Sequence, residues 1–115
     1  MKQPDDSARV RHMLESSLEA IEFLGDTSFE NFRKNRIVAN AIVRSLEVIG
    51  EAANQVTQEF KDDHRDIEWH VIIGMRNRLI HAYFDIDYLV VWQTVRENLP
   101  PFINQLKKIL KDSET

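Results

Sequence analysis

Apolar residues recur at three- and four-residue steps along most of the chain, which is the spacing of amphipathic helices. The first such stripe comprises Val10, Met13, Leu14, Leu18, Ile21 and Leu24. Any of residues 5–7 can cap the helix that carries it, and Gly25 can end it. The pattern therefore predicts a first helix that begins near residue 5 and ends before Gly25.

A longer stripe follows and predicts a helix over residues 29–60 with an irregular first turn. Its members are Phe32, Val38, Ile42, Leu46, Ile49, Ala53 and Val56. Thr27 and Glu30 have the spacing of a capping box at its start. Gly50 lies inside the stripe, where a glycine costs about 1 kcal/mol relative to alanine. We therefore interpret Gly50 as the point where another helix approaches closely.

The rest of the chain predicts three shorter helices. A polar connection over residues 61–66 precedes a third helix, which runs from residue 67 to residue 81 or 82. Asp85 or Asp87 can cap a fourth helix, whose apolar residues are Leu89, Val90, Trp92 and Val95. Pro100 and Pro101 mark a break, because proline disfavours helix in the residue before it but fits a first turn. A last helix then spans residues 101–111.

These elements together predict an all-α bundle of four or five helices, formed as a single domain over residues 1–115. The chain has three glycines and three prolines, and no alternating strand pattern persists. It has no cysteine, which excludes disulfides and thiolate metal sites. The first residues lack the apolar core of a signal peptide, and no apolar run is long enough to span a membrane. We expect a cytoplasmic protein that contacts no membrane.

The segment from Arg76 to Tyr83 combines residues that suit phosphodiester chemistry. Arginine binds phosphate through a fixed fork of donors, and histidine transfers protons near pH 7. Asn77 and His81 are four residues apart and share a face of the predicted helix. Arg76 and His81 are five apart, about 140° around an ideal helix. The reach of the arginine, or a loosened last turn, must bring these two side chains together.

The segment Trp69-His70-Val71-Ile72-Ile73-Gly74-Met75-Arg76-Asn77-Arg78-Leu79-Ile80-His81-Ala82-Tyr83-Phe84-Asp85-Ile86-Asp87 resembles the motif region of the HepT-like toxins, a branch of the HEPN superfamily. The resemblance extends to residues 44–52, Trp92 and Leu99-Pro100, so it covers nearly the whole chain. It implies a HEPN-like helical bundle that dimerises and acts as a metal-independent ribonuclease without a cofactor. It also implies that Arg76, Asn77 and His81 are the catalytic residues.

The resemblance further implies control of a toxin by an antitoxin. The partner is a small nucleotidyltransferase that attaches AMP to the tyrosine matching Tyr83 and so silences RNA cleavage. Cleavage needs a base for the ribose 2′-hydroxyl, an acid for the leaving oxygen and cations for the phosphorane. One chain offers one suitably placed histidine, so a two-fold dimer would supply both proton-transfer roles.

Structural interpretations of the same residues remain open at this stage. His81 can be a histidine stabilised near a helix end, and Arg76 can form a surface ion pair. Asn77 can be a surface amide, and Tyr83 can cover the end of the core. Glu47 and Glu51, one helical turn apart, suggest an ion pair with a motif arginine or a place at the dimer contact. The other histidines, His12, His64 and His70, lack partners at metal-ligand spacing, so no metal site is expected.

Two other classes of protein compete with the ribonuclease. The first is a non-catalytic helical binding module that partners a nucleotidyltransferase, because a chain of net charge −4 is a poor general binder of RNA. The second is a purely structural helical dimer, in which Arg76 and His81 point away from any shared cleft.

Overall fold

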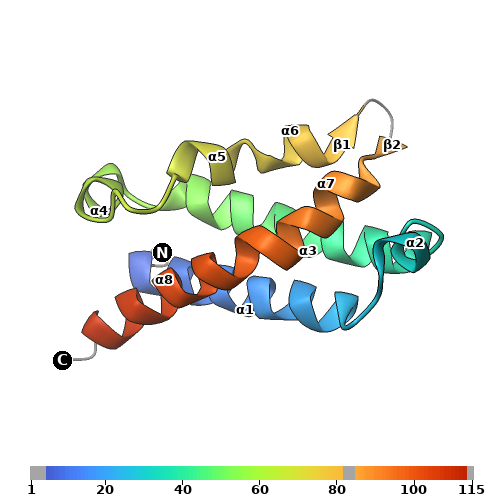
Figure 1. Ribbon diagram of the computed structural model, residues 1–115. Helices are drawn as coiled ribbons and strands as arrows, with labels where there is room; N and C mark the ends of the chain where they lie inside the picture. Colours follow the sequence, from blue (N-terminus) through green and yellow to red (C-terminus); the bar gives the residue numbers. More distant parts are fainter. Residues whose placement is uncertain (1–4, 82–84, 114–115) are drawn as a thin grey trace.

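The computed structural model describes residues 5–81 and 85–113, and over these residues the protein is an all-α bundle (Figure 1). Its long helical segments are α1 (Asp6–Leu24), α3 (Arg36–Gln55), α5 (Trp69–Ile73) followed by α6 (Met75–Leu79), and α7 (Tyr88–Gln93) continued by the π-helical turn η1 (Thr94–Asn98) and α8 (Leu99–Ser113). Short elements join them: α2 (Phe29–Phe32), α4 (Gln58–Asp63), β1 (Ile80–His81) and β2 (Asp85–Ile86). The predicted all-α bundle is confirmed, with four long segments.

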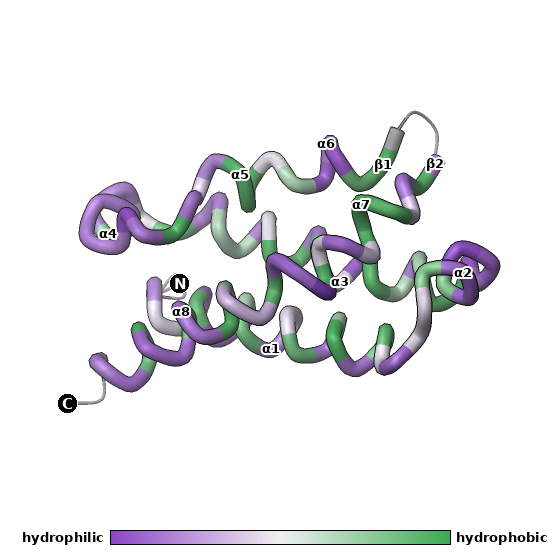
Figure 2. The backbone as a smooth tube through the Cα atoms, in the orientation of Figure 1, coloured by the Kyte–Doolittle hydropathy of each residue, from purple (hydrophilic) through white to green (hydrophobic). Residues whose placement is uncertain are grey.

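The central helix of the bundle is α3. Helix α1 packs along one side of it, and α5 with α6 packs along another. Helix α8 lies on α1, so the start of α1 and the end of α8 are at the same end of the molecule (Figure 1). Hydrophilic residues gather on α4 and on the middle of α6 (Figure 2). Among the described residues, no helix has the length and apolar character needed to cross a bilayer.

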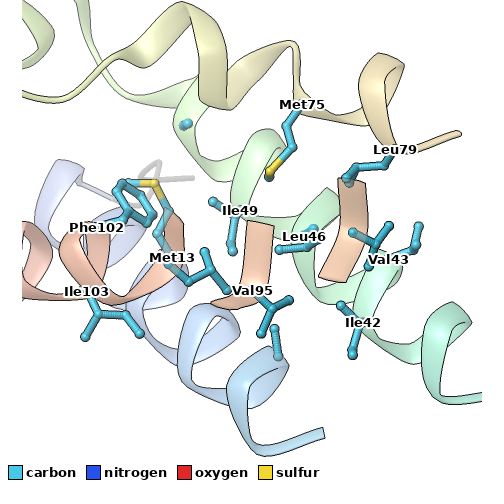
Figure 3. Close-up of a cluster of buried hydrophobic side chains, with 14 of the residues drawn as sticks. Met13, Ile42, Val43, Leu46, Ile49, Met75, Leu79, Val95, Phe102 and Ile103 are labelled. Carbon is cyan, nitrogen blue, oxygen red and sulfur yellow. The ribbon is translucent and has the colours of Figure 1, made fainter. Parts of the chain in front are cut away.

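The core is filled by side chains from all four long segments (Figure 3). Its buried members include Met13, Ile42, Leu46, Ile49, Met75, Leu79, Val95, Phe102 and Ile103. The stripe predicted for the second helix is confirmed, with Val38 as its partly buried member. Since α3 contributes to the core on both of its packed sides, it fixes where the other helices lie.

The first helix begins and ends as predicted, but its buried face differs in part. Asp5 caps α1, and Gly25 ends it with a positive φ of 53°. Leu18, predicted in the stripe, is 44% exposed, whereas Ser17 and Ala20 are fully buried. The buried positions advance by alternating three- and four-residue steps, so Ser17 takes the place predicted for Leu18.

The helix predicted over residues 29–60 is wrong as one element, because two polar residues interrupt it. Asn35 accepts a hydrogen bond from the backbone N–H of Val38 and starts α3. Thr57 likewise accepts a hydrogen bond from the backbone N–H of Phe60 and starts α4. The cap at the beginning is Ser28 rather than Thr27. Such side chains compete with the helix for backbone donors and therefore favour new helix starts over helix interiors.

The break predicted at Pro100 and Pro101 is also wrong, since the helix runs from α7 through α8. The turn η1 directly precedes the prolines, and the N–H of Leu99 donates to the carbonyl of Thr94, five residues back. A proline inside a regular α-helix removes a hydrogen bond and clashes with the carbonyl four residues earlier. We infer that the wider π-helical turn makes room for the proline rings, so the helix continues.

Gly50 marks a close approach between α3 and α5, as predicted. A Cβ atom added to Gly50 would lie 3.3 Å from the carbonyl oxygen of Ile72 and 3.7 Å from that of Ile73. The first distance is shorter than ordinary van der Waals contact, so a larger side chain here would push the two helices apart. The absence of a side chain at Gly50 therefore sets how near α5 lies to α3.

We predict that Gly50→Val lowers the free energy of unfolding by about 1–3 kcal/mol, the usual effect of overpacking a close contact. The branched side chain would meet the Ile72 carbonyl directly. Urea denaturation followed by circular dichroism measures the change. The control is Asn54→Val at an exposed position one turn along α3, which should stay within about 0.5 kcal/mol of the wild type. Equal losses in the two variants would contradict this account of Gly50.

Candidate functional site

Two buried anchors position the motif segment on α6. Met75 and Leu79 are four residues apart and face the core, where they meet Leu46 and Ile49 of α3 (Figure 3). The three polar residues between the anchors, Arg76, Asn77 and Arg78, are therefore exposed. The burial of two apolar side chains thus presents the polar motif residues at the surface.

The helix ends at Leu79, earlier than predicted. Ile80 is extended, with φ −127° and ψ 118°, and β1 pairs antiparallel with β2 so that His81 lies opposite Asp85. The N–H of Asp87 donates to the Leu79 carbonyl at 2.8 Å. Asp87 also caps α7, as predicted. Because this pairing replaces the last helical turn, the expectation that Asn77 and His81 share a helix face is wrong.

The guanidinium of Arg76 is bound to a carboxylate on α3. Its Nε donates to Oε2 of Glu47 at 2.9 Å, which confirms the predicted ion pair with a motif arginine. The Glu47 side chain is 22% exposed, and that of Arg76 is 61% exposed. Glu51 pairs instead with Arg44 at 3.3 Å. The pair at Glu47 therefore joins a sheltered carboxylate to an arginine that remains open to solvent.

Arg76 borders a hollow between α3 and the α5–α6 segment, which we call the α3 hollow. It is lined by Leu46, Glu47, Gly50, Glu51, Asn54, Ile73 and Arg76. Two carboxylates and one guanidinium thus share this small space, with Gly50 at its wall. The hollow places charged groups of α3 next to the motif arginine.

Asn77 and Arg78 lie at a different depression, the α7 groove. It is lined by Asn77, Arg78, Asp87, Val90, Gln93, Thr94, Glu97 and Asn98. Arg78 is also tied to α5, because its Nη2 donates to the Val71 carbonyl at 3.2 Å. The structure therefore separates two predicted catalytic residues, with Arg76 beside α3 and Asn77 beside α7 and η1.

The remaining site predictions concern residues that the structure describes in part or not at all. The backbone of His81 is the end of β1, but its side chain lies outside the described part of the molecule, as does the whole of Tyr83. The roles predicted for these two residues thus stay predictions. Among the side chains that the structure describes, no group of three or more histidine and acidic residues is placed to hold a metal ion.

Sequence reasoning did not anticipate the role of Arg96. Its two Nη groups donate to the carbonyls of Gly25 and Thr27, at 2.7 and 2.9 Å, and Nε1 of Trp92 also donates to Thr27. These bonds tie the turn after α1 to α7 and η1. No local pattern signals them, because the partners are about 70 residues apart along the chain.

Comparison with known proteins places most of the chain in one family. A family model described as "Ribonuclease HepT-like" matches residues 13–109. The chain is 39% identical over 102 residues to "Putative RNase TTE0752" of Caldanaerobacter subterraneus, covering 89% of this chain and 91% of that protein. It is also 39% identical over 102 residues to "Probable ribonuclease HepT" of Thermococcus cleftensis, covering 85% and 93%.

A third relative extends over almost the whole chain. "Putative RNase MJ1216" of Methanocaldococcus jannaschii is 36% identical over 114 residues, which cover 99% of this chain and 94% of that protein. No solved structure matches significantly. The extent of the family match and the coverage of these relatives lead to one conclusion: the chain belongs to the HepT-like ribonuclease family.

Proposed function

We propose that this protein is a metal-independent endoribonuclease in which Arg76 and His81 act on the RNA backbone. The observation that carries the proposal is the ion pair of Arg76, whose exposed guanidinium is held at Nε by Glu47. Arg76 lies five residues before His81 in the chain. The relatives are named as ribonucleases, and the motif resembles that of the HepT-like toxins. Arg76 is thus a cation at a defined place on the surface.

The chemistry uses a nucleophile that RNA itself supplies. The ribose 2′-oxygen attacks the adjacent phosphorus while a base removes its proton, and the 5′-oxygen leaves with a proton from an acid. The products are a 2′,3′-cyclic phosphate and a free 5′-hydroxyl. His81 is suited to the proton transfers, and Arg76 to the charge of the phosphorane. Asn77 would orient His81 or contact the phosphate.

The proposal includes a two-fold homodimer. The reaction has two proton-transfer roles, and each chain contributes one motif histidine. A two-fold axis next to the motif would bring two copies of His81 and two of Arg76 to one cleft. One histidine would then act as base while the other acts as acid.

We further propose that the protein is the toxin of a toxin–antitoxin pair, silenced at Tyr83. A nucleotidyltransferase antitoxin would transfer AMP from ATP to the tyrosine oxygen, with pyrophosphate as the leaving group. The added nucleotide brings bulk and a negative phosphate two residues from His81. It would therefore occupy the RNA path and repel the substrate backbone.

One observation favours the alternative of a non-catalytic module that partners a nucleotidyltransferase. The net charge of the chain is −4, and the α7 groove beside Asn77 contains Asp87 and Glu97. These charges oppose the approach of RNA. The experiment that separates the two functions is an RNA cleavage assay with purified protein in EDTA.

We predict that His81→Ala lowers the rate of RNA cleavage by about 10²–10⁴-fold, the usual contribution of a general acid or base. Cleavage of a fluorescent RNA on a gel measures the rate, and the wild type should keep its rate in EDTA. His12→Ala, at an exposed position on α1, is the control and should cleave normally. Full cleavage by His81→Ala would exclude the proposed role of His81, and inhibition by EDTA would exclude a metal-independent reaction.

We predict that the active species is a dimer. Sedimentation velocity over a range of concentrations should show a dimer, and specific activity should fall as dilution produces monomer, because a monomer holds a single His81. A monomer that keeps the full cleavage rate would contradict the shared cleft.

We predict that Tyr83→Phe abolishes adenylylation without loss of RNA cleavage, because phenylalanine lacks the acceptor oxygen. Intact mass spectrometry after incubation with ATP and the proposed nucleotidyltransferase antitoxin measures the modification. Tyr88→Phe is the matched control, since Tyr88 is the other tyrosine of the chain, and it should accept AMP normally. An adenylylated Tyr83→Phe protein would place the modification on another residue.

A further inference from the structure

We propose that Glu47 is a positioning residue, which holds the guanidinium of Arg76 by its Nε edge and leaves the Nη groups for a phosphate. The inference rests on the proposed function, because Arg76 is assigned there to the RNA backbone. It adds a residue of α3, outside the motif segment, to the apparatus of the reaction.

The geometry of the ion pair supports this role. The carboxylate Oε2 is 2.9 Å from Nε of Arg76, the distance of a charge-assisted hydrogen bond. A guanidinium is planar and has five N–H donors in fixed directions, of which Nε supplies one. Holding Nε therefore restricts the direction of the whole plane. The four Nη donors are those that a phosphate would use in a bidentate contact.

The different burial of the two partners shows which one fixes the other. Glu47 lies in the middle of α3, a long helix packed on both sides, and its side chain is 22% exposed. Arg76 lies on a five-residue helix, and its side chain is 61% exposed. A long exposed arginine samples many rotamers in water. The sheltered carboxylate on the rigid helix therefore limits the motion of the exposed cation.

The neighbouring charged residues on α3 pair with each other and do not occupy the Glu47 carboxylate. Arg44 is one helical turn before Glu47, close enough to compete for its carboxylate. Arg44 instead pairs with Glu51 at 3.3 Å. Among the described residues, Glu47 thus has the motif arginine as its partner, although an arginine of its own helix lies nearby.

The packing of the helices also brings the pair within reach. The close contact at Gly50, three residues after Glu47, sets the distance between α3 and α5. Arg76 follows four residues after Ile72, whose carbonyl faces Gly50. The same contact that packs α5 against α3 therefore brings the side chains of Glu47 and Arg76 together.

A positioning role and a merely structural ion pair predict different behaviour. An ion pair with a solvent-exposed partner contributes little to folding stability, so its loss should leave the fold intact. If Glu47 acts through Arg76, its removal matters for cleavage when Arg76 is present and has no further effect when Arg76 is absent. A double-mutant cycle separates these cases.

The first test compares Glu47→Ala, Arg76→Ala and the double variant in single-turnover cleavage of a short RNA. We expect Glu47→Ala to slow cleavage by about 10- to 100-fold, as for misplacement of a catalytic group, while its melting temperature stays near that of the wild type. Glu47→Gln, which keeps an oxygen acceptor, should restore part of the rate. The double variant should be no slower than Arg76→Ala.

The control for this test is Glu30→Ala. It removes one carboxylate from an ion pair in which both partners are exposed, Glu30 with Arg33, and changes the net charge by the same amount. The charge matters because a less acidic chain attracts RNA more strongly. The control should cleave at the wild-type rate. Equal rates for Glu47→Ala and Glu30→Ala, or a double variant much slower than Arg76→Ala, would overturn the proposal.

The second test does not depend on activity. The Nε–Hε resonance of Arg76 in an NMR spectrum should show slow exchange with water in the wild type and in Glu30→Ala, and fast exchange in Glu47→Ala. An unchanged resonance in Glu47→Ala would overturn the proposed contact. A wild-type protein that cleaves no RNA would instead overturn the proposed function, and the Arg76 resonance would still decide whether Glu47 holds the guanidinium.

Discussion

The contact between α3 and α5 at Gly50 is the constraint on which the rest of the arrangement depends. A Cβ atom at residue 50 would lie only 3.3 Å from the Ile72 carbonyl oxygen, so the missing side chain allows the α5–α6 segment to lie close to α3. Met75 and Leu79 can then reach the core, and the residues between them turn outward. The position of Arg76 relative to Glu47 follows from the same contact. The missing side chain at Gly50 of the central helix thus affects the location of charged groups at the surface.

The sequence predicts best those features that nearby residues decide. Asp5, Gly25 and Asp87 cap their helices as expected, because each acts on backbone groups within one turn. Distant hydrogen bonds decide other boundaries. The early end of α6 depends on the N–H of Asp87 reaching the Leu79 carbonyl, and no local pattern contains this information. The continuous helix through Pro100 depends on a π-helical turn, which helical periodicity does not reveal.

The candidate site also has one feature that the sequence predicts and another that depends on how distant helices pack. The pairing of Glu47 with Arg76 could be predicted, since an acidic residue on one long helix and a motif arginine on the next are suitable partners. The separation of Arg76 from Asn77 could not, because it depends on which helices flank α6 on its two sides. The roles proposed for His81 and Tyr83 rest on the resemblance to the HepT-like family and on chemistry, since helical packing alone does not assign them.

The placement of α6 between two hollows has a consequence for the effects of amino-acid substitutions. Substitutions in the part of α3 that lines the α3 hollow alter the surroundings of Arg76. Substitutions in the parts of α7 and η1 that line the α7 groove alter the surroundings of Asn77. The two sets of lining residues have no member in common. A substitution in the lining of one hollow therefore changes the direct surroundings of one of these residues and not of the other, although the two residues are adjacent in the chain.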